Sequence, residues 1–246
     1  MIRLENINMT FKENLKKPLK VLEDINLEIK SGEFFVFLGP SGSGKSTILR
    51  IMSGLEKSYQ GKIILSEEIS SKDFGFVFQQ FGLFPWLTVW QNIELALNTK
   101  KMSFPQKKLA INEKLIMLGL EKFAQHQPRE LSGGMRQRVG LARALVANPQ
   151  VIFMDEPFSE LDSFTAEELR LDLLKIWQEQ KVTIIMVTHL IEEALQLADR
   201  IAVLTSCPGK VKKIIHNSLS RPRIKRSNEF YQLEDELFSL IKPDSR

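Results

Sequence analysis

The sequence is poor in cysteine and has no long hydrophobic run. Its one cysteine, Cys207, rules out an internal disulfide and fits a reducing compartment. No apolar run approaches the roughly 20 residues that a membrane-spanning helix needs. The first seven residues, Met-Ile-Arg-Leu-Glu-Asn-Ile, lack the shape of a signal peptide. We therefore expect a globular chain that is neither disulfide-stapled nor membrane-embedded.

The sequence also lacks a large excess of charge of either sign. The 34 Lys and Arg residues against 30 Asp and Glu leave a formal net charge of +4, which neither requires nor excludes nucleic acid or an anionic membrane surface. With 246 residues, 43% of them hydrophobic and 26% charged, the chain can bury a large core as one domain with a subdomain, or as two small domains.

The most informative stretch is Gly-Pro-Ser-Gly-Ser-Gly-Lys-Ser-Thr at residues 39–47. It fits the phosphate-binding pattern G-x-x-x-x-G-K-[ST]. The glycines let backbone N–H groups turn around an anion, Lys45 supplies a point charge, and Ser46 offers a hydroxyl to Mg²⁺. An apolar run precedes it at 34–38 and a helical pattern follows at 47–52, so the helix N-terminus faces the phosphates. A glycine-rich turn that binds nothing is disfavoured by this order.

A pair of carboxylates, Asp155 and Glu156, follows the apolar run Val151–Met154. The carboxyl end of a buried strand is where α/β sheets place ligands. Asp155 is suited to hold Mg²⁺, and Glu156 to orient or deprotonate an attacking water. Such a pair alone usually marks a solvated strand end, but the phosphate-binding stretch favours the functional interpretation.

The remaining pattern predicts an α/β fold. Alternating residues indicate strands at Ile2/Leu4 and Ile25–Ile29 joined by a hairpin loop from Lys12 to Lys20. The apolar runs 151–154 and 183–187 each follow a helical pattern, which favours a parallel sheet with crossover helices. Residues 81–147 carry helical periodicity. The basic run 221–226 reads as a solvated tail, with contact to acidic lipid head groups as the less favoured alternative.

We therefore expect a phosphate-loop NTPase core with a mostly parallel sheet, an N-terminal antiparallel β region and an inserted helical subdomain. The whole chain, 1–246, is expected to form a single domain. Its predicted parts are an α/β core at 1–80 and 148–215, a helical subdomain at 81–147, and a short helical tail at 216–246.

The segment Leu131–Arg138, Leu-Ser-Gly-Gly-Met-Arg-Gln-Arg, has the features of a second anion site. Ser132 can cap a helix, and Gly133 and Gly134 would expose N–H groups at its positive end. From the residues alone, an ordinary capped helix is equally acceptable.

The chain resembles the ATP-hydrolysing subunit of ABC transporters. The motifs that carry the resemblance are, in chain order, the stretch 39–47, Gln79, the segment 131–138, the segment 151–162 and His189. The Leu-Ser-Gly-Gly-Met sequence separates this family from other phosphate-loop NTPases, and the resemblance covers residues 1–215. It implies that two copies face each other head to tail and enclose two ATP molecules. The ATP-binding residues it implies are Phe11, Gly39, Pro40, Ser41, Gly42, Ser43, Gly44, Lys45, Ser46, Thr47, Ser132, Gly133, Gly134 and Asp162.

The resemblance also assigns chemistry. It implies catalytic roles for Glu156, for Gln79 and for His189, the last of which would contact the γ-phosphate. Mg²⁺ would be held by Ser46, Gln79 and Asp155. Gln80 is an alternative to Gln79, but the Val-Phe-Gln frame favours Gln79.

Two further roles follow from the resemblance. Asp162 would belong to the loop that couples the two ATP sites. Phe11 would stack on adenine, with simple core packing as the alternative.

Three positions depart from the family pattern. Glu160 replaces a small residue between Ser159 and Leu161, Leu190 replaces the Asp that usually follows the histidine, and His126-Gln127 stands where an aromatic is common. None removes a catalytic group, but Glu160 puts the strength of coupling between the two sites in question.

The aromatic-rich segment 81–92 resembles the region that receives the coupling helix of a membrane subunit. With the Cys207-Pro208-Gly209-Lys210 turn, it resembles the nitrate, sulfonate and taurine importer subfamily. Related members of that subfamily carry pyrimidine precursors or other small organic compounds, and the resemblance does not choose among these solutes. The implied partners are a second copy, transmembrane permease subunits and, indirectly, a solute-binding protein, but no nucleic acid. The implied location is the cytoplasmic face of the membrane. An exporter ATPase and a soluble ABC ATPase acting on DNA or ribosomes are the alternatives.

Overall fold

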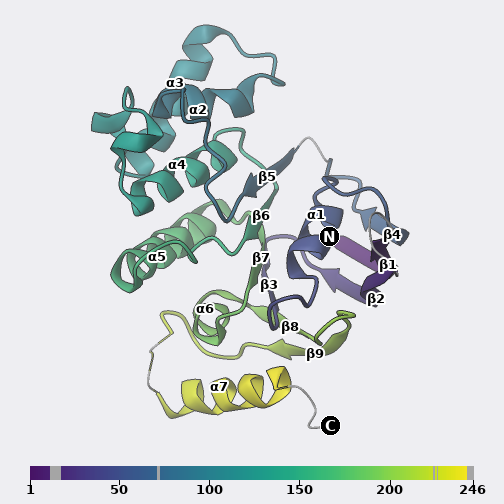
Figure 1. The fold of residues 1–246 in the computed structure, drawn as a ribbon. Helices are drawn as coiled ribbons and strands as arrows, with labels where there is room; N and C mark the ends of the chain where they lie inside the picture. The colour runs from purple at the N-terminus through teal and green to yellow at the C-terminus, as the bar shows by residue number, and fades with distance from the viewer. Residues whose placement is uncertain (12–17, 71–72, 224, 226, 243–246) are drawn as a thin grey trace. The chain divides into compact units, whose positions relative to one another are not determined.

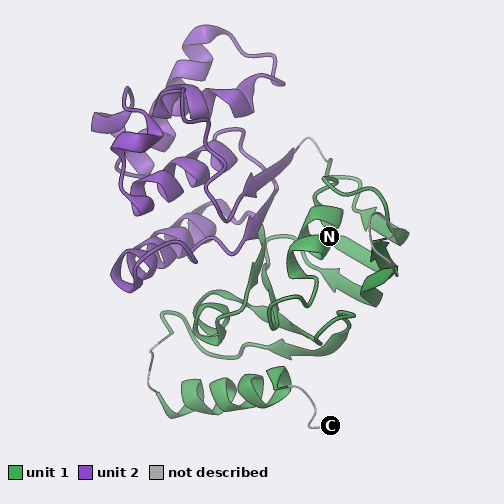
Figure 2. Ribbon diagram, in the orientation of Figure 1, with its two compact units in different colours: residues 1–71, 183–246 green, residues 72–182 purple. Residues whose placement is uncertain are grey.

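The computed structural model describes residues 1–11, 18–70, 73–223, 225 and 227–242. It groups the chain into two compact units, Met1–Ser71 with Thr183–Arg246, and Lys72–Val182 (Figure 2). The subdomain boundaries expected at 80/81 and 147/148 remain a prediction. No helix among the described residues is long and apolar enough to span a bilayer.

The first unit contains a three-stranded antiparallel sheet in the order β2-β1-β4 (Figure 1). Its strands are β1 (Ile2–Phe11), β2 (Leu19–Ile29) and β4 (Gln60–Leu65). Ile2 and Leu4, and then Ile7 and Met9, are buried in β1. Each pair alternates as a strand with one face on the core requires, and the alternation slips by one residue between Leu4 and Ile7, where the strand register shifts. The loop predicted from Lys12 to Lys20 ends two residues too late, because β2 begins at Leu19; residues 12–17 of that loop lie outside the described part.

The first unit also contains a mixed group of strands around β3 (Phe34–Leu38). It pairs in parallel with β7 (Thr183–Thr188) and β8 (Arg200–Leu204), and β9 (Val211–His216) pairs antiparallel with β8. All residues of β3 and β7 are buried, which explains why both read as continuous apolar runs. The helices are α1 (Lys45–Met52), α6 (Ile191–Leu197) and α7 (Asn228–Ile241).

The basic run after β9 is not a solvated tail. Arg221 donates to the Leu197 carbonyl at 2.6 Å and pairs with Asp199 at 2.5 Å. Arg223 donates to the carbonyls of Leu195 at 2.9 Å and Gln196 at 3.0 Å. These carbonyls end α6, where cations are favourable. Burial lowers the pKa of Arg223 to about 10. The interpretation as a solvated tail was therefore wrong at both arginines; residues 224 and 226 lie outside the described part.

The second unit pairs β5 (Phe74–Val77) with β6 (Val151–Asp155) in parallel. Four α-helices follow or precede these strands: α2 (Val89–Glu94), α3 (Phe104–Met117), α4 (Gly133–Leu145) and α5 (Ser163–Gln180). Short 3₁₀ turns among the described residues of this unit include Leu95–Leu97, Glu121–Phe123 and Pro128–Glu130. Val139, Ala142 and Leu145, which recur at helical spacing, are buried on α4, whereas Leu109 on α3 is 74% exposed and lies outside the core. The predicted α/β class with a mostly parallel sheet is confirmed.

Candidate nucleotide site

The phosphate-binding loop joins β3 to α1 in the first unit. Gly42 and Gly44 have φ angles of 78° and 84°, left-handed values that glycine adopts without strain. The Lys45 side chain is buried, and its Nζ donates to the carbonyls of Gly39 and Pro40, both at 3.0 Å. The loop backbone therefore curls around the ammonium group at the N-terminus of α1, an arrangement that suits an anion.

Ser43 adds a polar group inside this loop. Its side chain is fully buried, and its hydroxyl oxygen has no hydrogen-bond partner. Buried hydroxyls are normally paired, so the loop retains an unsatisfied polar atom. A cradle of glycine backbone, one ammonium and this hydroxyl fits a polyphosphate.

His189 lies at the same edge of the sheet as the loop. Leu38 pairs with Thr188 across β3 and β7, so Gly39 and His189 each follow a paired residue. The buried Thr188 hydroxyl donates to Glu193 Oε2 at 2.6 Å and accepts from Leu190 N–H at 3.1 Å. These bonds fix the backbone on both sides of His189, and the structure thus brings the predicted histidine together with the phosphate loop.

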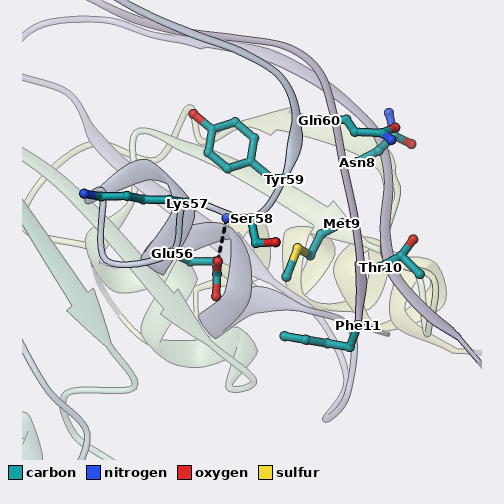
Figure 3. A pocket seen from close by; sticks show the side chains of 9 residues that line it. All are labelled: Asn8, Met9, Thr10, Phe11, Glu56, Lys57, Ser58, Tyr59 and Gln60. Atoms are coloured by element: carbon teal, nitrogen blue, oxygen red, sulfur yellow. Dashed lines mark hydrogen bonds between the residues drawn. The ribbon is translucent and has the colours of Figure 1, made fainter. Parts of the chain in front are cut away.

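Phe11 ends β1 beside a cavity of about 670 Å³. The cavity is lined by residues 8–11 of β1 and by residues 56–60, which include Glu56 and Ser58 (Figure 3). Phe11 is 41% exposed, so it is not packed in the core, which was the alternative to stacking. Glu56 accepts a hydrogen bond from Ser58 N–H at 2.6 Å and tightens the opposite wall. An exposed ring beside a cavity suits stacking on a planar base.

In the second unit, the two carboxylates and Gln79 meet at one sheet edge. Val77 of β5 pairs with Met154 of β6, so Gln79 and Glu156 each lie two residues beyond a paired position. Asp155 ends β6 and is buried, whereas Gln79 is exposed. Parallel strands that end together place these groups side by side, as a water- or metal-orienting site requires.

Glu156 has a left-handed backbone with φ of 44°. Residues other than glycine adopt this conformation only when their surroundings enforce it, and such residues cluster at functional sites. The Glu156 carbonyl accepts from Ser159 N–H at 3.2 Å and from the Ser159 hydroxyl at 3.0 Å. These two bonds hold the turn that begins at Glu156.

The segment 131–134 forms a capped helix start. Ser132 is the N-cap of α4, and its hydroxyl accepts from Met135 N–H at 3.2 Å. Gly134 is buried, and a Cβ there would lie 2.3 Å from Thr165 Cγ2 of α5. Arg138 pairs with Asp172 of α5 at 2.7 Å. Ser132 and Gly133 stay accessible while the rest of the turn is fixed to α5.

Asp162 is the N-cap of α5. Its carboxylate accepts from the N–H groups of Phe164 at 3.1 Å and Thr165 at 3.0 Å. Hydrogen bonds from Thr165, the side chain foremost, hold the pKa of Asp162 below its usual value. The carboxylate therefore stays charged at neutral pH while it caps the helix, next to the Glu160 and Leu161 atoms that approach Gly133.

The sequence did not predict that two arginines of α4 contact the segment after Gln79. Arg143 donates to the carbonyls of Gly82 at 2.6 Å and Phe81 at 3.1 Å, and the Arg136 guanidinium lies 5.2 Å from the centre of the Phe81 ring. Burial lowers the pKa of Arg143. The signal was a helical spacing of seven residues between two arginines, which places both on one helix face.

No three His, Cys, Asp or Glu side chains gather as metal ligands within the described part of the chain. The predicted Mg²⁺ set would not produce such a cluster, because it combines one carboxylate, Asp155, with the Ser46 hydroxyl and the Gln79 amide. Mg²⁺ completes its shell with waters and substrate phosphates, so these residue types fit it.

Comparison with known proteins agrees with this chemistry. The family model described as "ABC transporter" matches residues 22–159. The aliphatic sulfonates import ATP-binding protein SsuB of Bacillus subtilis is 43% identical over 89% of this chain and 86% of its own length. The nitrate import ATP-binding protein NrtD of Synechocystis is 41% identical over 90% and 88%.

A solved dimeric ATP-binding cassette in a post-hydrolysis state, bound to ADP and Pi, is also similar. It has a TM-score of 0.77 and 37% sequence identity, and it covers 88% of this chain and 99% of its own. The chain belongs to the ABC transporter family. It is an ATP hydrolase whose activity is coupled to transport.

Proposed function

We propose that this chain powers the import of a small oxyanionic solute, an organosulfonate or nitrate, as one of two ATPase subunits attached to membrane permease subunits. The observation that carries this proposal is that the predicted catalytic side chains follow the ends of paired parallel strands. His189 follows β7 beside the phosphate loop, and Gln79 and Glu156 follow β5 and β6. Relatives named for sulfonate and nitrate import support the solute class.

In this proposal, the residues of each chain divide the work on ATP. The loop 39–47 binds the phosphates, and Phe11 stacks on adenine. Ser46, Asp155 and Gln79 hold Mg²⁺, which neutralises phosphate charge. Glu156 orients and deprotonates the attacking water, and His189 contacts the γ-phosphate.

We infer a head-to-tail dimer in which Ser132, Gly133 and Gly134 of one copy close over the ATP of the other. Asp162 would carry the coupling between the two sites. The accessible helix start at Ser132 and the dimeric relative support this arrangement. The dimer would lie on the cytoplasmic face of the membrane, and a solute-binding protein would deliver the solute to the permease.

Glu156→Gln tests the catalytic assignment. The amide keeps the shape of the side chain but cannot accept a proton, so we expect hydrolysis to fall about 100-fold or more while ATP binding is retained. ATP with Mg²⁺ should then hold the chain as a dimer in size-exclusion chromatography. Glu121→Gln, an exposed change outside the site, should match the parent chain. Parent-like hydrolysis by Glu156→Gln would move the base role to another residue.

The solute class needs a separate experiment. The chain would be reconstituted in liposomes with its permease, and ATP hydrolysis measured with the solute-binding protein loaded with taurine, an alkanesulfonate or nitrate. Stimulation by one of the three assigns the solute. Stimulation by none would exclude this class while leaving the ATPase assignment intact.

A further inference from the structure

The turn between β8 and β9, Thr205–Lys210, lies against the phosphate loop at Gly209. A Cβ built on Gly209 would lie 2.1 Å from the carbonyl oxygen of Ser43 and 3.2 Å from its carbonyl carbon. Gly209 is not among the residues with positive φ, so its backbone conformation suits any residue. The need for glycine here is one of space alone.

This turn is held firmly to β2 (Figure 1). Gly209 N–H donates to the Val21 carbonyl at 2.8 Å, and Glu23 N–H donates to the Gly209 carbonyl at 3.0 Å. Thr205 closes the turn, since its hydroxyl donates to the Pro208 carbonyl at 2.8 Å and accepts from Lys210 N–H at 2.9 Å. An ion pair of 3.1 Å joins Lys210 to Glu23. Moving the turn away from the loop would therefore break these hydrogen bonds and the ion pair.

The phosphate loop presses against the same support one residue further on. A Cβ on Gly44 would lie 2.6 Å from Leu22 Cδ2, and Leu22 is the β2 residue that bridges to Gly209. A Cβ on Gly44 would also lie 3.2 Å from the Val21 carbonyl oxygen, which accepts from Gly209 N–H. Ser43 therefore lies against the turn, and Gly44 against the β2 residues to which the turn is hydrogen-bonded.

This contact has a consequence for anion binding. In a planar trans peptide the carbonyl of one residue and the N–H of the next point in opposite directions. Because the Ser43 carbonyl faces Gly209, the Gly44 N–H is directed away from the support, toward the inner side of the loop. We propose that Gly209 is a positioning residue that sets the direction of the loop N–H groups that bind phosphate. This inference rests on the proposed role of residues 39–47.

Gly209→Ala tests the proposal. We expect the KM for ATP and the Kd for ATP to rise about tenfold or more, since small misplacements of binding groups have effects of this size, while kcat at saturating ATP stays within about twofold. Gly140→Ala on α4 is the matched control, because a Cβ there would meet its nearest atom, the Phe81 carbonyl oxygen, at an ordinary 3.5 Å; it should keep the parent KM.

A second pair of variants decides the matter if Gly209→Ala fails to fold. Thr205→Val loses both hydroxyl bonds without adding an atom and should raise KM in the same direction, whereas Thr205→Ser should restore the parent KM. A parent-like KM in Gly209→Ala, or in Thr205→Val where Gly209→Ala does not fold, overturns the positioning role. The proposed phosphate site itself is tested by a different variant. It would be contradicted only if Lys45→Ala binds ATP with the affinity of the parent chain.

Discussion

At the scale of single residues, the Lys45 ammonium both stabilises the phosphate loop and is proposed to bind the nucleotide. It donates to the Gly39 and Pro40 carbonyls inside the phosphate loop, and it is the point charge proposed to bind the β- and γ-phosphates. A hydrogen bond to a charged group contributes about 1.5–3 kcal/mol. We expect Lys45→Ala to raise the Kd for ATP by about 10- to 100-fold, measured by nucleotide titration.

The matched control removes the same charge elsewhere in the first unit. Lys30 is exposed and follows β2, outside the phosphate loop and outside the lining of the cavity beside Phe11, so Lys30→Ala changes the net charge equally without touching either. It should bind ATP with the parent affinity. Equal weakening by both changes would mean that net charge, rather than the loop, determines affinity.

The sequence predicts residues of this kind well, because a nine-residue motif defines a local backbone shape. Lys45, Gly42 and Gly44 act within one loop, so their spacing in the sequence is enough to identify them. The contact of Gly209 with Ser43 joins residues far apart in the chain, and no local pattern encodes it. The strain at Glu156 is likewise invisible in the sequence, since its φ of 44° is enforced by the turn that follows.

At the scale of secondary structure, the attachment of α4 to α5 depends on the missing side chain at Gly134. A Cβ would lie 2.3 Å from Thr165 Cγ2, and threonine is stiff in a helix. We expect Gly134→Ala to lower the free energy of unfolding by about 1–3 kcal/mol, the usual cost of overpacking, measured by urea denaturation.

A rescue variant identifies the cause. Thr165→Ser removes the methyl group that the new Cβ would meet and keeps the hydroxyl. The double change Gly134→Ala with Thr165→Ser should recover most of the lost stability, and Thr165→Ser alone should have a small effect. If the double variant is as unstable as Gly134→Ala, the loss comes from the helix start itself rather than from the contact with α5.

The periodicity of α4 was predictable because its buried residues recur at helical spacing. The attachments of α4 were not, because they depend on long polar side chains whose targets lie elsewhere. Arg143 reaches the Phe81 and Gly82 carbonyls, and Arg138 reaches Asp172. The same reason explains the error over Arg221 and Arg223, which a local reading placed in solvent and which in fact cap α6.

At the scale of the whole molecule, the aromatic segment after Gln79 is an exposed surface on a rigid support. Trp86 is 68% exposed and Phe84 43%, and their ring centres are 5.4 Å apart. The buried Asn92 donates to the carbonyls of Phe84, Leu87 and Thr88 and accepts from Phe84 N–H. The exposure of Trp86 leaves its ring available to a partner rather than packed inside the helical part of the second unit.

The exposure of Trp86 separates its effect on assembly from its effect on folding. Trp86→Ala should change the free energy of unfolding by less than about 1 kcal/mol, because an exposed side chain packs against little, and should leave the ATPase rate of the isolated chain unchanged. Assembly with the permease should weaken by about 2 kcal/mol or more if Trp86 is an interface anchor. Thermal melts and a permease pull-down on the same variant measure both.

Phe104→Ala is the control, since Phe104 is 65% exposed at the start of α3, outside the segment. It removes a comparable exposed ring and should assemble as the parent does. A large drop in melting temperature for Trp86→Ala without an assembly defect would place Trp86 in a structural role. Equal assembly defects for both variants would mean that the permease contacts a wider part of the second unit, because a ring in the turn before α2 and a ring on α3 would then contribute alike.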